Sequence, residues 1–85
     1  MKKEMIVTLE GNKKYYLAEE TIQNNIKYYL ANELNEIENQ TDKSVILEEI
    51  KTENDYYLDL VTDEKNLKFL SAIFISNFIS EIEEI

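Results

Sequence analysis

The segment that most constrains the fold is the apolar stretch from Leu67 to Ile82, which reads LKFLSAIFISNFISEI. Its apolar residues recur with the three- and four-residue spacing of one side of an α-helix, and its length allows four or more turns. Thr62 or Asp63 is placed to cap the start of this helix, and Glu64 falls in its first turn. A helix this apolar needs a second layer to bury it, and we expect the rest of the chain to supply that layer.

The predicted helix has one broad apolar face and two large apolar residues outside it. Phe69 and Ile73 fall on the far side, so we interpret them as candidates for contact with another protein. The apolar face itself comprises Leu67, Leu70, Phe74, Ile75, Phe78, Ile79, Ile82 and Ile85.

Two hairpins are predicted ahead of that helix. Residues 5–9 alternate as a strand does, Gly11-Asn12 favours a reversal, and residues 13–18 form a second strand. A three-residue loop there would pair Leu9 with Tyr15 and Val7 with Leu17, which puts all four side chains on one face. The second hairpin comprises residues 44–51 and 55–61, with its turn at residues 52–54.

Between the hairpins, residues 19–38 follow helical spacing and predict another helix, which Thr21 could cap. The residues that carry this spacing are Ile22, Ile26, Tyr29, Leu30, Leu34 and Ile37. Residues 39–42 are polar and are interpreted as the connector to the second hairpin.

The chain also resembles itself at an offset of 41 residues. This offset lays Tyr15-Tyr16-Leu17 on Tyr56-Tyr57-Leu58 and matches Thr21 with Thr62. It also aligns Asn25 with Asn66, Lys27 with Lys68 and Ala31 with Ala72. We therefore predict an α+β fold of one domain over residues 1–85, built from two ββα repeats at about 4–39 and 44–85. The two repeats would form a four-stranded antiparallel sheet with both helices packed on one face.

In that arrangement the two faces of the sheet have different roles. The face predicted to meet the helices comprises Val7, Leu9, Tyr15, Leu17, Ile46, Ile50, Tyr56, Leu58 and Leu60. The other face comprises Ile6, Thr8, Tyr16, Val45, Leu47, Glu49, Tyr57, Asp59 and Val61. That second face is apolar and rich in tyrosine, which predicts an interface through Ile6, Tyr16, Leu47 and Tyr57.

Composition excludes several classes of function. The chain has no cysteine, no histidine and a single glycine, so it has no thiol nucleophile, no imidazole base and no glycine-rich phosphate loop. We accordingly expect a protein that is not an enzyme and that has no cofactor and no metal site. No secretory signal is visible, and the longest apolar stretch is too short for a membrane span, which predicts a cytoplasmic location without membrane contact.

The net charge of −9 argues against direct binding of nucleic acid and is compatible with a basic protein partner. Carboxylates are dense around the second hairpin; the candidates for an acidic surface are Glu48, Glu49, Glu53, Asp55, Asp59 and Asp63. The preferred interpretation of these residues is a solvated surface that only keeps the protein soluble. Glu33, whose repeat partner is Phe74, lies either at the edge of an apolar stripe or buried within it.

These features predict a small acidic protein-binding module that forms a homodimer and binds another protein. The alternative is an acidic inhibitor of the phage or mobile-element type that imitates nucleic acid and blocks a DNA- or RNA-handling protein. Short hairpin-plus-helix proteins of bacteria and phages have a similar general shape, and that likeness transfers no residue roles.

Overall fold

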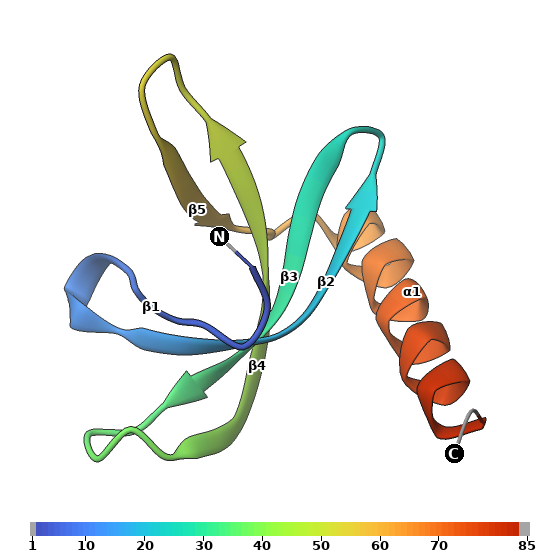
Figure 1. The fold of residues 1–85 in the computed structure, drawn as a ribbon, viewed down its shortest axis with the longest axis horizontal. Coiled ribbons are helices and arrows are strands. Elements are labelled where there is room, and N and C mark those ends of the chain that lie inside the picture. Colours follow the sequence, from blue (N-terminus) through green and yellow to red (C-terminus); the bar gives the residue numbers. More distant parts are fainter. Residues whose placement is uncertain (1, 84–85) are drawn as a thin grey trace.

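The computed structural model describes residues 2–83, with side chains up to residue 80, as one antiparallel sheet followed by a helix (Figure 1). The five strands of the sheet are neighbours in chain order. They are β1 (Ile6–Thr8), β2 (Lys14–Gln23), β3 (Ile26–Leu34), β4 (Gln40–Lys51) and β5 (Tyr56–Leu60), and the helix is α1 (Glu64–Glu83). A short 3-10 turn, Glu10–Asn12, links β1 to β2.

The predicted four-stranded sheet with two helices is wrong, because residues 19–38 form most of the β2–β3 hairpin and no helix. The turn of this hairpin is Asn24-Asn25, between the paired residues Gln23 and Ile26. Both asparagines have positive φ, 53° and 65°. A two-residue hairpin turn of this kind suits the twist of the strands, and asparagine tolerates it better than most residues. This turn ends any helix that the apolar spacing would otherwise favour.

The predicted internal repeat is wrong at the level of structure for the same reason. Its offset aligns Thr21 and Lys27, which lie in strands, with Thr62 and Lys68, which lie before and within α1. Only the part of the match that falls in the hairpins aligns a strand with a strand. The shared residues therefore do not correspond to two ββα units.

In the first hairpin the residues that were predicted to share a face do so, but the strands pair in a different register. Val7 pairs with Tyr15 and Ile6 with Tyr16, because the turn is centred on Gly11 and not on Asn12. Its turn includes Gly11, whose φ of 76° favours glycine, and closes with the Leu9 amide donating to the Lys13 carbonyl at 2.8 Å. A shift of two residues leaves every side chain on its original face, since the strand period is two.

The second hairpin and the start of the last helix are confirmed. Strand β4 pairs with β5 from Leu47↔Leu60 to Lys51↔Tyr56, with the predicted turn between them. Asp63 caps α1, since its Oδ2 accepts a hydrogen bond from the Asn66 amide at 3.0 Å. Within the described part of the chain, no helix combines the length and the apolar character needed to cross a membrane.

The sheet is buried in part on both faces. Its inner face closes on itself around Tyr15, Leu17, Tyr29, Ala31 and Leu47, which we call the inner cluster. Its outer face packs against α1 through Tyr28, Ile46, Leu70 and Phe74, which we call the outer cluster.

The predicted assignment of the sheet faces is therefore reversed for the first hairpin. Val7, Leu9, Tyr15 and Leu17 belong to or pack against the inner cluster, on the side away from α1. Val45 and Leu47, predicted to be on the open side, share that inner face. The curl has a local cause, because the β2–β3 pairing slips between Leu17 and Glu19 and an extra residue of this kind bends a strand.

The β2–β3 turn gives a direct test of this fold. Replacing Asn25 with alanine is expected to lower the free energy of unfolding by about 1–2 kcal/mol, because alanine is strained at positive φ. Asn25→Gly should leave it unchanged or raise it. Chemical denaturation followed by circular dichroism measures both. Asn54→Ala, in the β4–β5 turn, is the control and should have little effect; an equal loss there would contradict the account.

Candidate functional site

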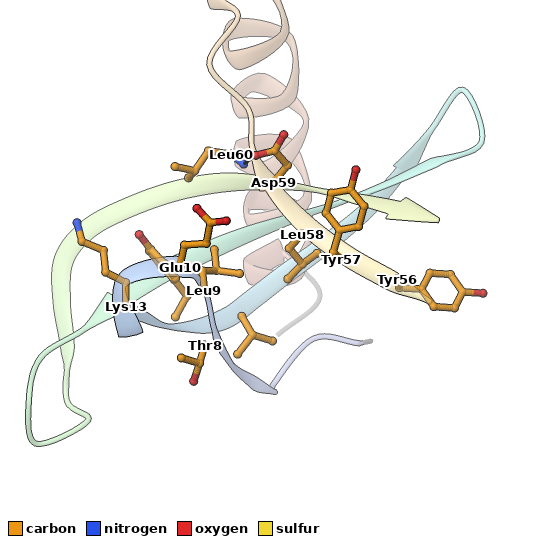
Figure 2. Close-up of a pocket in the computed structure, with 11 residues that line it drawn as sticks. Thr8, Leu9, Glu10, Lys13, Tyr56, Tyr57, Leu58, Asp59 and Leu60 are labelled. Carbon is orange, nitrogen blue, oxygen red and sulfur yellow. Dashed lines mark hydrogen bonds between the residues drawn. The ribbon is translucent and has the colours of Figure 1, made fainter. Parts of the chain in front are cut away.

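The two outermost strands of the sheet, β1 and β5, line one open groove (Figure 2). Its volume is about 820 Å³, within the range of about 300–1,000 Å³ typical of ligand pockets. The lining residues come from the first hairpin and from β5: Val7, Thr8, Leu9, Glu10, Lys13, Tyr15, Tyr56, Tyr57, Leu58, Asp59 and Leu60. Among the described strands β1 and β5 do not pair with each other, so the curled sheet is an incomplete barrel.

The floor of the groove is apolar. Tyr15 is a buried member of the inner cluster, and Val7, Leu9 and Leu58 pack against that cluster while remaining partly exposed. The floor is therefore continuous with the core and is held rigidly by it. An occupant with apolar side chains would extend the inner cluster.

The rim of the groove carries charge. Glu10 lies in the 3-10 turn after β1 and Asp59 lies on β5, and both are exposed. Lys13 Nζ lies 3.8 Å from Glu33 Oε1, and the Glu33 side chain is about one-fifth exposed at 21%. Of the two predicted environments for Glu33, the structure thus has the one at the edge of the apolar surface, beside a cation.

The outer edge of β5 presents backbone groups to the groove. The Val61 amide donates to the Ile46 carbonyl at 2.9 Å, so residues 57, 59 and 61 direct their backbone groups toward β4. By alternation, Tyr56, Leu58 and Leu60 direct theirs to the open edge. Two of these amides meet the preceding side chain: Tyr56 donates to Asp55 Oδ1 at 2.8 Å and Leu60 to Asp59 Oδ1 at 3.0 Å.

The edge of β1 is arranged in the same way. The Leu17 amide donates to the Met5 carbonyl, and the Leu9 amide to the Lys13 carbonyl. The backbone groups of residues 5, 7 and 9 therefore point toward β2, and those of Ile6 and Thr8 point to the open edge. The groove thus has hydrogen-bonding backbone on both walls, which is the arrangement that accepts an added strand.

A polar cluster occupies another part of the inner face. Lys27 Nζ lies 2.8 Å from Glu20 Oε2, and Tyr29 Oη donates to Glu49 Oε1 at 3.3 Å. Lys27 also lies over the Tyr29 ring at 5.3 Å from its centre. The hydrogen bond from Lys27 lowers the pKa of Glu20, and the bond to Glu20 raises the pKa of Lys27. Burial raises the pKa of Tyr29.

The ion pair between Glu20 and Lys27 predicts a pH dependence of stability. Because the pKa of Glu20 is lowered from 4.5 in the folded state, its contribution is present above pH 4.5 and is lost as the pH falls through the folded value. Glu20→Gln should lower the free energy of unfolding by about 0.5–1 kcal/mol at pH 7 and by much less at pH 3. Glu53→Gln, in an exposed turn, is the control. A Glu20→Gln effect of the same size at both pH values would contradict the prediction.

The predicted interface residues lie in different environments. Leu47 is fully buried in the inner cluster and is not accessible to a partner. Ile6, Tyr57 and Phe69 are about half exposed, whereas Tyr16 and Ile73 are less exposed than these. The structure brings only Tyr57 of this set to the groove.

Several of the predicted acidic-surface residues have local structural roles. Asp55, Asp59 and Asp63 accept hydrogen bonds from backbone amides, and Glu49 accepts one from Tyr29. Glu48 and Asp59 are cross-strand neighbours, and Glu53 lies in the exposed β4–β5 turn. In the part of the chain that the structure describes, no three carboxylates are grouped so as to hold a metal ion.

Sequence reasoning did not predict the groove. Glu10, Lys13 and Leu60 line it and were not candidates, because the site exists only when β1 and β5 approach. The one available signal was Asn24-Asn25, which adds a strand and so alters which edges meet.

Comparisons with protein-family models, with curated proteins and with solved structures found no match.

Proposed function

We propose that this chain is a protein-binding module without catalytic activity, and that the groove between β1 and β5 is its binding site. The observation that supports this most is the pair of open strand edges on either side of an apolar floor. Extended segments bind such edges through main-chain hydrogen bonds, and pockets for alternate side chains supply specificity.

The charge of the chain favours a basic partner. Each molecule carries a net charge of −9, so a basic segment is attracted to it over a long range. A second copy would bring the same negative charge to the groove. Charge complementarity thus favours a different protein as the occupant.

The test is a selection of peptides from a random display library on the immobilised protein. Groove-binding peptides should bind the wild type and Ile37→Lys but lose most of their affinity for Leu60→Lys. Leu60 lines the groove, and Ile37 is a 76%-exposed apolar residue outside it, so the two variants make the same change in chemistry. A selection that yields no peptide sensitive to Leu60→Lys would overturn the proposal.

Self-association stays a prediction, and the exposed apolar side chains of α1 give it a test. Phe69, Ile75, Phe78 and Ile79 are each at least half exposed. If these side chains hold a dimer, Phe69→Glu should reduce the solution mass measured by light scattering to that of a monomer. Ile37→Glu is the control, and an unchanged mass for Phe69→Glu would contradict the prediction. The nucleic-acid-mimic alternative and the cytoplasmic location also stay predictions.

A further inference from the structure

We propose that the occupant of the groove is one extended strand of a partner protein, antiparallel to both β1 and β5, with apolar side chains inward and lysine or arginine outward. This inference rests on the proposed function and specifies its ligand. The added strand would complete a six-stranded antiparallel barrel.

The direction of the strand follows from the strand count. Each of the five strands is antiparallel to its neighbour in chain order, so β1, β3 and β5 run the same way. If β1 and β5 met directly, they would form a parallel pair. One added strand that runs the other way is antiparallel to both walls at once and leaves a closed barrel without edges.

The backbone groups on the two walls can bond such a strand. The backbone groups of Ile6 and Thr8 point to the open edge of β1, and those of Leu58 point to the open edge of β5 at its middle. Strand β5 has five residues, so an added strand of similar length places about two or three side chains inward. Those side chains would meet Val7 and Leu9, which are apolar, and this predicts valine, isoleucine or leucine at alternate positions.

The outward side chains would meet acid and aromatic groups. Tyr57 and Asp59 lie on the outer side of β5, and Glu48 is the cross-strand neighbour of Asp59. A lysine or arginine on the added strand could pair with Asp59 and lie against the Tyr57 ring. Pairing of β5 with the β5 strand of a second copy, in the register that sets Asp59 opposite Asp59, would bring like charges together, which disfavours that pairing.

Asp59 also occupies a backbone donor at the open edge of β5. In the free protein its carboxylate accepts the Leu60 amide, one of the donors that an added strand would use. Charged side chains on an edge strand hinder pairing with unselected chains. A basic strand offers the Asp59 carboxylate a cation in exchange and frees the Leu60 amide for the main-chain ladder.

The experiment uses a seven-residue peptide of alternating lysine and valine, acetylated and amidated at its ends and labelled for fluorescence anisotropy. Two matched peptides test the two parts of the inference. One replaces the central valine by N-methylvaline, which keeps the side chain and removes one amide donor, and the other replaces every lysine by glutamate. We expect each to bind at least about tenfold more weakly than the parent.

Two protein variants locate the contact. Asp59→Lys should weaken binding of the lysine–valine peptide at least about tenfold, because it places like charges side by side. Asp42→Lys makes the same charge change at an exposed residue that does not line the groove and should weaken it much less. Circular dichroism of both variants verifies that they remain folded.

A spin label at the amino end of the peptide tests its direction. An antiparallel strand places that end near Thr8 and Leu60, so their amide resonances should broaden more than those of Ile6 and Tyr56. Stronger broadening at Ile6 and Tyr56, or equal binding of the N-methylated or glutamate peptide, would overturn the inference. Absence of binding by the parent peptide would also overturn it. Library peptides of other chemistry that depend on Leu60 would still support the proposed function, so the two failures are distinguishable.

Discussion

Replacing Phe74 with alanine is expected to lower the free energy of unfolding by about 3–5 kcal/mol, the usual cost of removing a buried aromatic ring. Phe74 is only 3% exposed and packs with Leu70, Tyr28 and Ile46 in the outer cluster, which attaches α1 to the sheet. Small domains are stable by only about 5–15 kcal/mol, so a large share of the total would be lost. Urea denaturation followed by circular dichroism and by tyrosine fluorescence measures the change.

Phe78 supplies the matched control on the same helix. It lies one turn after Phe74 and is 59% exposed, because the second half of α1 extends past the sheet (Figure 1). Phe78→Ala should change the free energy of unfolding by no more than about 0.5 kcal/mol. Equal losses for the two variants would mean that α1 does not pack on the sheet through Phe74.

The helix could be predicted from sequence because its signals are local. Asp63 precedes the apolar spacing by the distance that a cap requires, and Leu67, Leu70 and Phe74 define the face that is buried in the structure. The β4–β5 hairpin was predicted for a similar reason, since a polar turn separates two apolar runs. Neither feature depends on contacts between distant parts of the chain.

Residues 19–38 could not be assigned in the same way because their strands are buried on both faces. In β3, Tyr28 belongs to the outer cluster while Tyr29 and Ala31 belong to the inner cluster. Such a strand loses the alternation of apolar and polar residues and resembles a buried helix in its spacing. The turn residues Asn24 and Asn25 were the better guide, since their chemistry does not depend on the faces.

The groove depends on long-range geometry that no local pattern contains. The curl of the sheet follows in part from the slipped pairing between Leu17 and Glu19, which the sequence does not mark with glycine or proline. Without that curl, the two edges of a five-stranded meander lie at opposite ends of the sheet. The acidic and aromatic residues near β5 were visible in sequence, but their position opposite β1 was not.

Leu47→Ala is the second variant with a large expected effect, about 2–5 kcal/mol lost from the free energy of unfolding. Leu47 was predicted to be an interface residue, yet its side chain is fully buried in the inner cluster. It pairs with Tyr29 on one side and Leu60 on the other, so its removal leaves a cavity at the centre of the curled sheet. Denaturant unfolding by circular dichroism gives the loss, and light scattering tests the competing role.

Leu60→Ala is the control for this variant, because Leu60 is the same residue type on the same sheet face and is 46% exposed. It should cost no more than about 1 kcal/mol, since nearly half of the Leu60 surface stays exposed and gains nothing from burial. If Leu47 held an interface instead, Leu47→Ala would reduce the solution mass and leave the stability of the monomer nearly unchanged. If Leu47 belongs to the core, its loss lowers the stability at every protein concentration. That concentration dependence separates a core residue from an interface residue.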